Sequence, residues 1–152
     1  MNLKMAIACL AIVGATHANA ESHAAEEGAM AEVVTTGDAA KGEKVFRKCV
    51  SCHVVVNEAG ETLAGKKAKT GPNLYGIAGG KFGEVEDFKF GDAALAAAGT
   101  VMDEEAFVAY VADPTGWLRE VTGDSGARSK MSFKLKKEDD AKDVFAYLAS
   151  LK

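Results

Sequence analysis

Apolar residues recur at helical spacing in several stretches of the chain, whereas no stretch keeps the alternation of a β-strand for long. Within residues 100–112, Phe107, Tyr110 and Val111 fall on one face, and the stretch that begins at Glu138 carries a similar apolar row. Helices are predicted at residues 39 to about 49, 93–98, 100–112, 114–118 and from 138 onward. The pattern therefore predicts an all-α fold.

Polar residues at the ends of these stretches indicate where the helices begin. Asp38 is a good N-cap for the first helix, and Thr100 with Asp103 resembles a capping box. Pro114 suits the first position of a short helix. The acids that start at Glu138 favour the positive N-terminal end of a helix dipole.

Residues 1–20 have the pattern of a secretory signal peptide that is cleaved from the mature protein. Lys4 is the charged part, residues 5–15 are an apolar run, and Ala18-Asn19-Ala20 fits a cleavage site. The run is shorter than the ~20 apolar residues that cross a bilayer, so no membrane insertion is expected. Residues 21–37 are rich in Ala and Glu and predict a flexible acidic tail. Residues 38–152 form the expected domain.

The most specific motif is C-x-x-C-H at Cys49, Cys52 and His53. At this spacing two thiols bond covalently to a haem, and the histidine ligates its iron. Residues 54–91 are rich in glycine and predict ordered loops, which would wrap the haem. Haem attachment of this kind takes place outside the bacterial cytoplasm, so the chain is expected in the periplasm.

Three other interpretations of the motif remain open. A thioredoxin-like dithiol needs a preceding strand, yet residues 41–48 predict a helix. A zinc site needs four ligands, but beyond residue 23 only Cys49, Cys52 and His53 are available among Cys and His. A structural disulfide between the two cysteines is the third.

The second iron ligand decides between electron transfer and an open site for gas binding or catalysis. His23 lies in the expected tail, so a second histidine ligand is not expected. The mature chain offers Met30 in the tail, Met102 at the start of a predicted helix, and Met131 in a polar loop. Met102 has an ordinary packing explanation, whereas Met131 has a less obvious one.

Together these residues resemble a class I c-type cytochrome, in particular the bacterial cytochrome c2 group, over residues 37–152. Gly42, Phe46 and Tyr147 match positions where the first and last helices of that family cross. Two further motifs occur in the family's order and spacing: Thr70-Gly71-Pro72-Asn73-Leu74-Tyr75-Gly76 and Lys130-Met131-Ser132-Phe133.

The resemblance implies one covalent haem c, with Met131 as the sixth ligand and the Pro72 carbonyl accepting a hydrogen bond from His53. It places Tyr110 beside the methionine ligand, although a role in the core fits that residue equally well. Trp117 matches a family pocket aromatic, for which packing is the default role.

Three positions depart from the family. Where many relatives have an arginine, a tyrosine and a tryptophan that bind the buried haem propionate, this chain aligns Gly80, Phe90 and Met102. The resemblance therefore implies that this carboxylate has lost three hydrogen-bond donors.

The resemblance further implies a soluble, monomeric electron carrier that is not an enzyme and does not bind nucleic acid. Its partners would be a cytochrome bc1 complex as donor and a photosynthetic reaction centre or terminal oxidase as acceptor. They would dock on a lysine-rich rim, defined as Lys66, Lys67, Lys69, Arg128, Lys130, Lys134, Lys136 and Lys137. The alternatives are a haem enzyme or gas-binding protein with an open sixth site, and a module of a larger complex that docks through residues 21–37.

Overall fold

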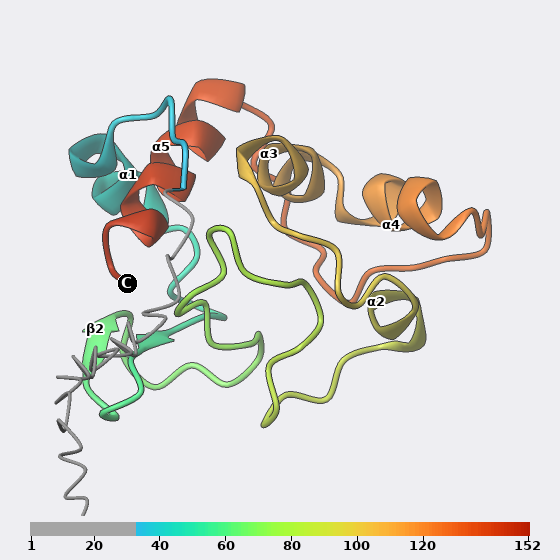
Figure 1. Cartoon of the computed structure of the whole chain (residues 1–152), viewed down its shortest axis with the longest axis horizontal. Helices are drawn as coiled ribbons and strands as arrows, with labels where there is room; N and C mark the ends of the chain where they lie inside the picture. The colour runs from blue at the N-terminus through green and yellow to red at the C-terminus, as the bar shows by residue number, and fades with distance from the viewer. Residues whose placement is uncertain (1–32) are drawn as a thin grey trace, which may run out of the picture. The chain divides into compact units, whose positions relative to one another are not determined.

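The computed structural model describes residues 33–152, and helices dominate it (Figure 1). The helices are α1 (Ala39–Phe46), α2 (Asp92–Ala96), α3 (Glu104–Ala112), α4 (Pro114–Thr122) and α5 (Glu138–Ala149). A short antiparallel hairpin joins β1 (Val55–Val56) to β2 (Thr62–Ala64). The expected all-α class is confirmed. The expected signal peptide, and residues 21–32 of the expected tail, lie outside the described residues.

Residues 36–38 lie against the helices, although the sequence assigned 36 and 37 to the tail. The backbone N–H and Oγ1 of Thr36 donate to the Glu104 carboxylate at 2.7 and 2.5 Å. The Asp38 N–H donates to Asp143 Oδ1 at 2.7 Å. The chain is therefore hydrogen-bonded to α3 and α5 just before α1 begins.

Helix α1 begins at the predicted place and ends earlier than predicted. Asp38 Oδ1 accepts hydrogen bonds from the N–H groups of Ala40 and Lys41 at 2.9 and 3.1 Å, as an N-cap does. After Phe46 the chain continues in hydrogen-bonded turns, in which Cys49 N–H donates to the Phe46 carbonyl at 2.8 Å. These turns carry the C-x-x-C-H motif.

Helices α1 and α5 cross at Gly42, as the family resemblance implied. A Cβ at Gly42 would collide with the carbonyl of Asp143, so only glycine allows this approach. The rings of Phe46 and Tyr147 pack beside the crossing, with centroids 5.5 Å apart.

Gly42→Ala should therefore destabilise the protein by about 1–3 kcal/mol, the usual cost of overpacking a core. In a solvent-exposed helix interior, a change from Gly to Ala stabilises by up to about 1 kcal/mol. A loss of stability at Gly42 would therefore indicate the steric limit at the crossing. Gly116→Ala in α4 is the matched control, because its Cβ would approach only the side chain of Asp113, with Oδ2 at 2.9 Å, and no backbone atom. Denaturant unfolding of both holoproteins measures the difference; equal midpoints would contradict this account of the crossing.

Helix α3 begins later than the sequence predicted. Asp103 is its N-cap and accepts from the Ala106 N–H at 2.8 Å, whereas the Thr100 hydroxyl donates to the Ala97 carbonyl. Val101 instead forms a β-bridge with Lys81. The predicted capping box is wrong because Thr100 belongs to the turn that ends α2, and α2 itself stops at Ala96.

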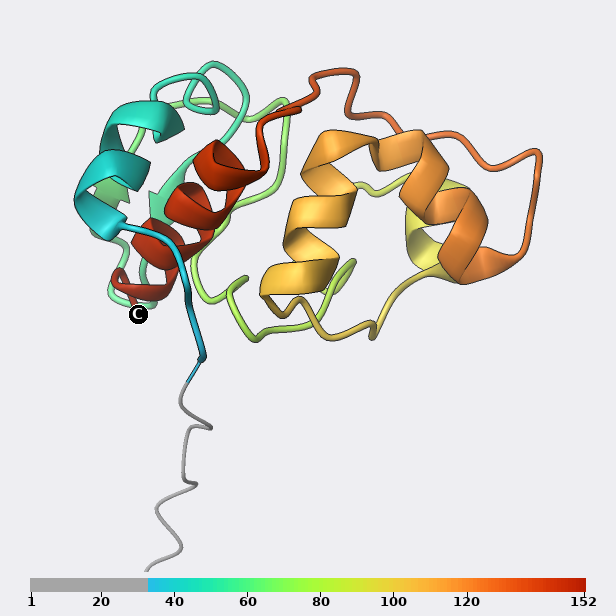
Figure 2. The same cartoon turned by 90° about the horizontal axis from the view of Figure 1, so that it is seen from above.

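Helix α4 follows α3 directly and runs past the predicted end at residue 118. Gly123, with φ of 67°, terminates it in the left-handed conformation that glycine adopts without strain. Residues 123–137 then return to α5 without a helix or a strand (Figure 2). Among the described residues no helix is long and apolar enough to cross a membrane.

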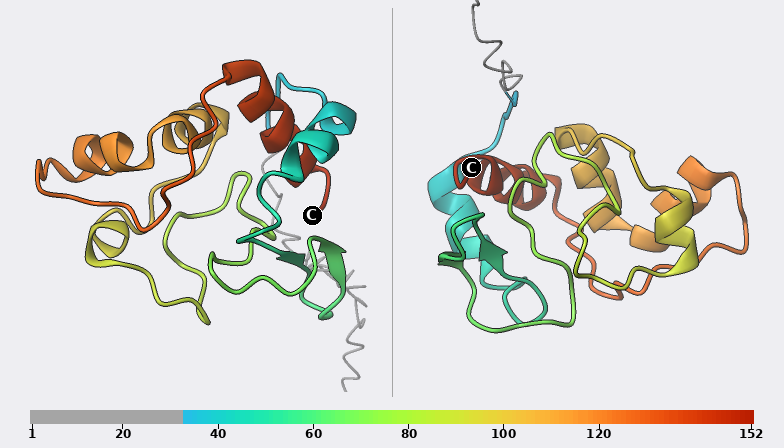
Figure 3. Two further views of the ribbon diagram at one scale, coloured as in Figure 1. Left: turned by 180° about the vertical axis from the view of Figure 1, so that it is seen from behind. Right: turned by 60° about the horizontal axis from the view of Figure 1, so that its bottom comes forward.

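The glycine-rich residues 54–91 lie opposite helices α3, α4 and α5 (Figures 1 and 3). The Leu74 N–H ties these loops to the Val54 carbonyl at 2.9 Å, and the Asn73 side chain bonds both backbone groups of Val56. These bonds hold the glycine-rich loops together on this side of the fold.

Candidate haem site

One cavity collects most of the residues that the sequence singled out. Separate parts of the chain line it: the end of α1 and the turns after it, the glycine-rich loops, helix α3, and the loop before α5, with single residues from α2 and α5. Apolar groups form most of its wall, including Phe46, Leu74, Ile77, Phe82, Val85, Phe88, Phe90, Met102, Phe107, Val111, Phe133 and Val144.

Cys49 and Cys52 both line this cavity as free, half-buried thiols. Burial raises the pKa of the Cys49 thiol to about 11, so this thiol is neutral near pH 7. A thioredoxin-like dithiol needs a reactive thiolate, and here a helix precedes the motif. Within residues 33–152 no group of three His, Cys, Asp or Glu side chains could hold a metal ion. Neither competing chemistry has support in the structure.

His53 is oriented as an iron ligand requires. Its Nδ1 lies 2.9 Å from the Pro72 carbonyl, which can only accept, so Nδ1 carries the proton and Nε2 is left free. Burial lowers the pKa of the imidazole, and the hydrogen bond to Pro72 opposes this in part. A neutral ring with a free nitrogen is the form that binds metals.

Gly71 allows this orientation, because a Cβ there would collide with the imidazole ring of His53. Two free thiols, an unprotonated imidazole nitrogen and an apolar wall therefore share one cavity. These residues fit a covalently attached haem.

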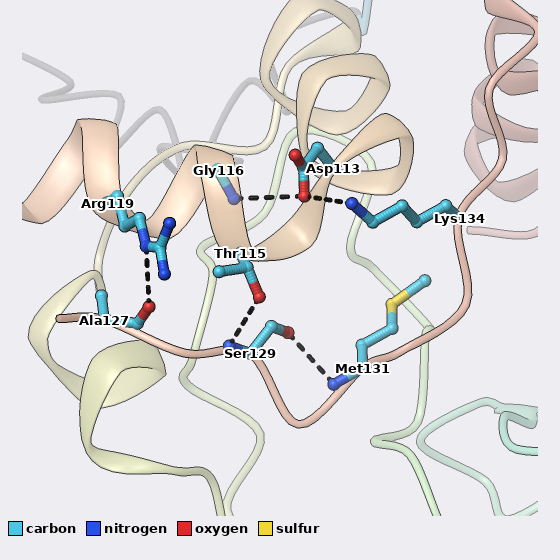
Figure 4. A network of polar contacts seen from close by, with 8 residues as sticks. All are labelled: Asp113, Thr115, Gly116, Arg119, Ala127, Ser129, Met131 and Lys134. Carbon is cyan, nitrogen blue, oxygen red and sulfur yellow. Dashed lines mark hydrogen bonds and ion pairs between the residues drawn. The ribbon is translucent and has the colours of Figure 1, made fainter. Parts of the chain in front are cut away.

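Two of the three candidate methionines line the cavity, and Met30 lies outside the described residues. Met102 is only 1% exposed, and its backbone bonds on both sides hold it to Gly79 and Gly80. Met131 is half-buried in the irregular residues 123–137, below α4 (Figure 4). Met102 is therefore a core residue, whereas Met131 is partly buried and packs against the core from an irregular loop.

Tyr110 lines the cavity, whereas Trp117 is not among the lining residues. The Trp117 ring is buried behind the wall, with its centroid 5.1 Å from that of Phe82 and 5.3 Å from that of Tyr110. Burial raises the pKa of the Tyr110 hydroxyl, and a hydrogen bond with Ser129 opposes this. Phe82 joins these aromatic residues, and sequence reasoning missed it because it lies among glycines without periodicity.

The three departures from the family pattern differ in their surroundings. Phe90 and Met102 present apolar side chains to the cavity. Gly80 does not line it, and a Cβ at Gly80 would collide with the carbonyl of Gly76. The backbone at this position accepts no larger side chain without a shift.

Comparison with known proteins agrees with this geometry. The family model described as cytochrome c matches residues 39–152. The chain belongs to the cytochrome c family. Cytochrome c2 of Rhodovulum adriaticum is 56% identical over 121 residues, which cover 78% of this chain and 96% of that protein. Cytochrome c-550 of Paracoccus versutus is 49% identical over 125 residues, covering 80% of this chain and 79% of that protein.

A solved structure of cytochrome c2 from Rhodobacter sphaeroides superimposes with a TM-score of 0.74 at 51% identity, covering 76% of this chain and 96% of that one. The fold is therefore that of a class I c-type cytochrome resembling cytochrome c2. The cytochrome carries one covalently bound haem c. It is an electron carrier and not an enzyme.

Proposed function

We propose that the cytochrome is an exported, soluble shuttle whose haem is bonded to Cys49 and Cys52, with His53 and Met131 as the two axial ligands. The observation that carries this proposal is that all four side chains reach the same cavity from two distant parts of the chain. The hydrogen bond from His53 to Pro72 supports the proximal role, since such contacts fix the ring of a ligating histidine.

Met131 is a better candidate for the sixth ligand than Met102. The Met102 backbone is paired to the Gly79–Gly80 turn, and its side chain belongs to the buried core. Met131 is carried by a loop without helix or strand that borders the cavity, and its backbone N–H donates to the Ser129 hydroxyl at 3.0 Å. A thioether ligand favours Fe(II) and raises the reduction potential.

The haem, when bound, supplies the one-electron couple of its iron. The protein then excludes other chemistry, because a filled sixth position leaves no place for a substrate or gas. The apolar wall formed by Phe82, Phe90 and Phe107 keeps water away and disfavours the extra charge of the oxidised iron. The arrangement thus suits rapid electron exchange, in which both axial ligands would stay in place.

Carbon monoxide separates this proposal from a gas-binding or enzymatic haem. We expect the spectrum of the reduced protein to stay unchanged when carbon monoxide is added, because Met131 occupies the site. A prompt spectral shift would support the alternative with an open sixth position.

The proposed location is the periplasm, and the proposed partners are a cytochrome bc1 complex and a photosynthetic reaction centre or terminal oxidase. The export pattern in residues 1–20 and the relatives named cytochrome c2 support both. We propose that the cytochrome docks transiently as a monomer on the lysine-rich rim.

Two members of the lysine-rich rim are engaged within the molecule. Lys134 pairs with Asp113 at 2.8 Å, and Lys130 Nζ donates to the carbonyls of Lys89 and Phe90 at 3.2 and 3.4 Å. No ion pair within residues 33–152 involves Lys136 or Lys137. The latter two are therefore the cleaner positions for a docking test.

Lys136→Glu combined with Lys137→Glu should slow the second-order reaction with a membrane redox complex by about tenfold at low salt. The effect should fade toward 1 M salt, where the Debye length is only about 3 Å. Stopped-flow kinetics measure this against Lys44→Glu with Lys152→Glu, which changes the net charge equally. These two exposed lysines form no ion pair within residues 33–152. The docking role is wrong if this control pair slows the reaction just as much.

A further inference from the structure

One face of α4 holds the loop that carries Met131. Thr115 and Arg119 are four residues apart and so share a face of the helix. Arg119 Nε donates to the Ala127 carbonyl at 3.2 Å, and the Ser129 N–H donates to Thr115 Oγ1 at 3.2 Å (Figure 4). Two points of the loop are thereby fastened to one helix.

A third fastening lies at the N-terminal end of α4. Asp113 Oδ1 caps the helix by accepting from the Gly116 N–H at 3.2 Å, and it also accepts from Lys134 Nζ at 2.8 Å. Both side chains of this ion pair are about half exposed, and such pairs contribute little to stability. The half-buried bond between Ser129 and Thr115 is therefore the more important one.

Ser129 connects Thr115 to Met131 by hydrogen bonds. Its backbone N–H donates to Thr115 Oγ1, while its Oγ accepts the Met131 N–H at 3.0 Å. Residues 123–137 have no helix or strand of their own, so these bonds replace a backbone ladder. Thr115 thus reaches Met131 through a single intervening residue.

We propose that Thr115 is a positioning residue that holds the axial sulfur of Met131 in place through Ser129. This proposal rests on the proposed ligation by Met131. Loss of the Thr115 hydroxyl leaves the half-buried Ser129 N–H without its acceptor and loosens the loop, so an external ligand displaces the sulfur more easily.

Thr115→Val tests this, because valine keeps the shape and removes the acceptor. Imidazole, added to the oxidised holoprotein at about pH 8 where it is mostly neutral, competes with the methionine sulfur. We expect the association constant for imidazole to rise about fivefold, as the loss of one hydrogen bond predicts. The far-red methionine-to-iron band should fall in parallel.

Two variants separate positioning from general stability. Thr122→Val removes a hydroxyl from the same helix that donates to the Leu118 carbonyl and accepts from the Asp124 N–H at 3.3 Å, but bonds neither Ser129 nor Met131. It should therefore leave imidazole binding within about twofold of wild type. Thr115→Ser keeps the acceptor and should restore wild-type binding. Equal imidazole binding by Thr115→Val and Thr122→Val would overturn the proposal.

Amide hydrogen exchange in the wild-type holoprotein provides a test that does not depend on a variant. The Ser129 amide should exchange far more slowly than an unstructured peptide, as should the Leu135 amide, which donates to Val111. Unprotected exchange at Ser129 would overturn the role of Thr115. Failure of the Met131 ligation itself looks different: the wild type would lack the far-red band and bind imidazole tightly from the outset.

Discussion

Met131→Ala is expected to open the sixth iron position and to lower the reduction potential by on the order of 0.1 V, because a soft ligand that favours Fe(II) is lost. Axial ligands set haem potentials over a range of about 0.8 V, so a change of this size is reasonable. The variant should also bind carbon monoxide when reduced. Redox titration and absorption spectra measure both effects.

Met102→Ala is the matched control, since both methionines line the cavity. Met102 is 1% exposed, and truncating a buried methionine costs about 2–5 kcal/mol of stability. The control should therefore unfold at lower denaturant while it keeps a closed sixth position. If Met102→Ala opened the site and Met131→Ala did not, the ligand assignment would be reversed.

Cys49→Ser and Cys52→Ser are each expected to reduce the yield of holoprotein by roughly tenfold or more. One thioether bond is lost, and without bound haem the apolar cavity between the loops and α3 has nothing to pack against. Haem staining after denaturing electrophoresis, together with absorption of the purified protein, measures covalent attachment.

Ser51→Ala is the control within the motif, because Ser51 is exposed and lies between the two cysteines. Its holoprotein yield should match that of wild type. Normal amounts of covalent haem in both cysteine variants would contradict the assignment of the attachment site.

Local sequence chemistry was enough to predict most of the helices and to select the residues of the proposed haem attachment. Asp38, Pro114 and Glu138 mark helix starts in the structure as they do in the sequence. The spacing of Cys49, Cys52 and His53 is short enough that a few turns bring them to one cavity. Such features depend on neighbours within a few residues.

Features that depend on distant parts of the chain were not predictable in the same way. Thr100 is a residue type that often caps helices, but the β-bridge between Val101 and Lys81 keeps residues 100 and 101 out of α3. The bond between Thr115 and Ser129 joins two residues with no shared pattern. The steric limit at Gly80 arises from the path of the loop at Gly76, which composition alone does not reveal.

The far-red absorption of the oxidised wild-type protein tests the central claim most directly. Ligation by Met131 predicts a weak methionine-to-iron charge-transfer band there, which disappears as added cyanide slowly displaces the sulfur. A spectrum without that band, combined with immediate cyanide binding, would contradict the His53 and Met131 ligation and the closed electron carrier built on it.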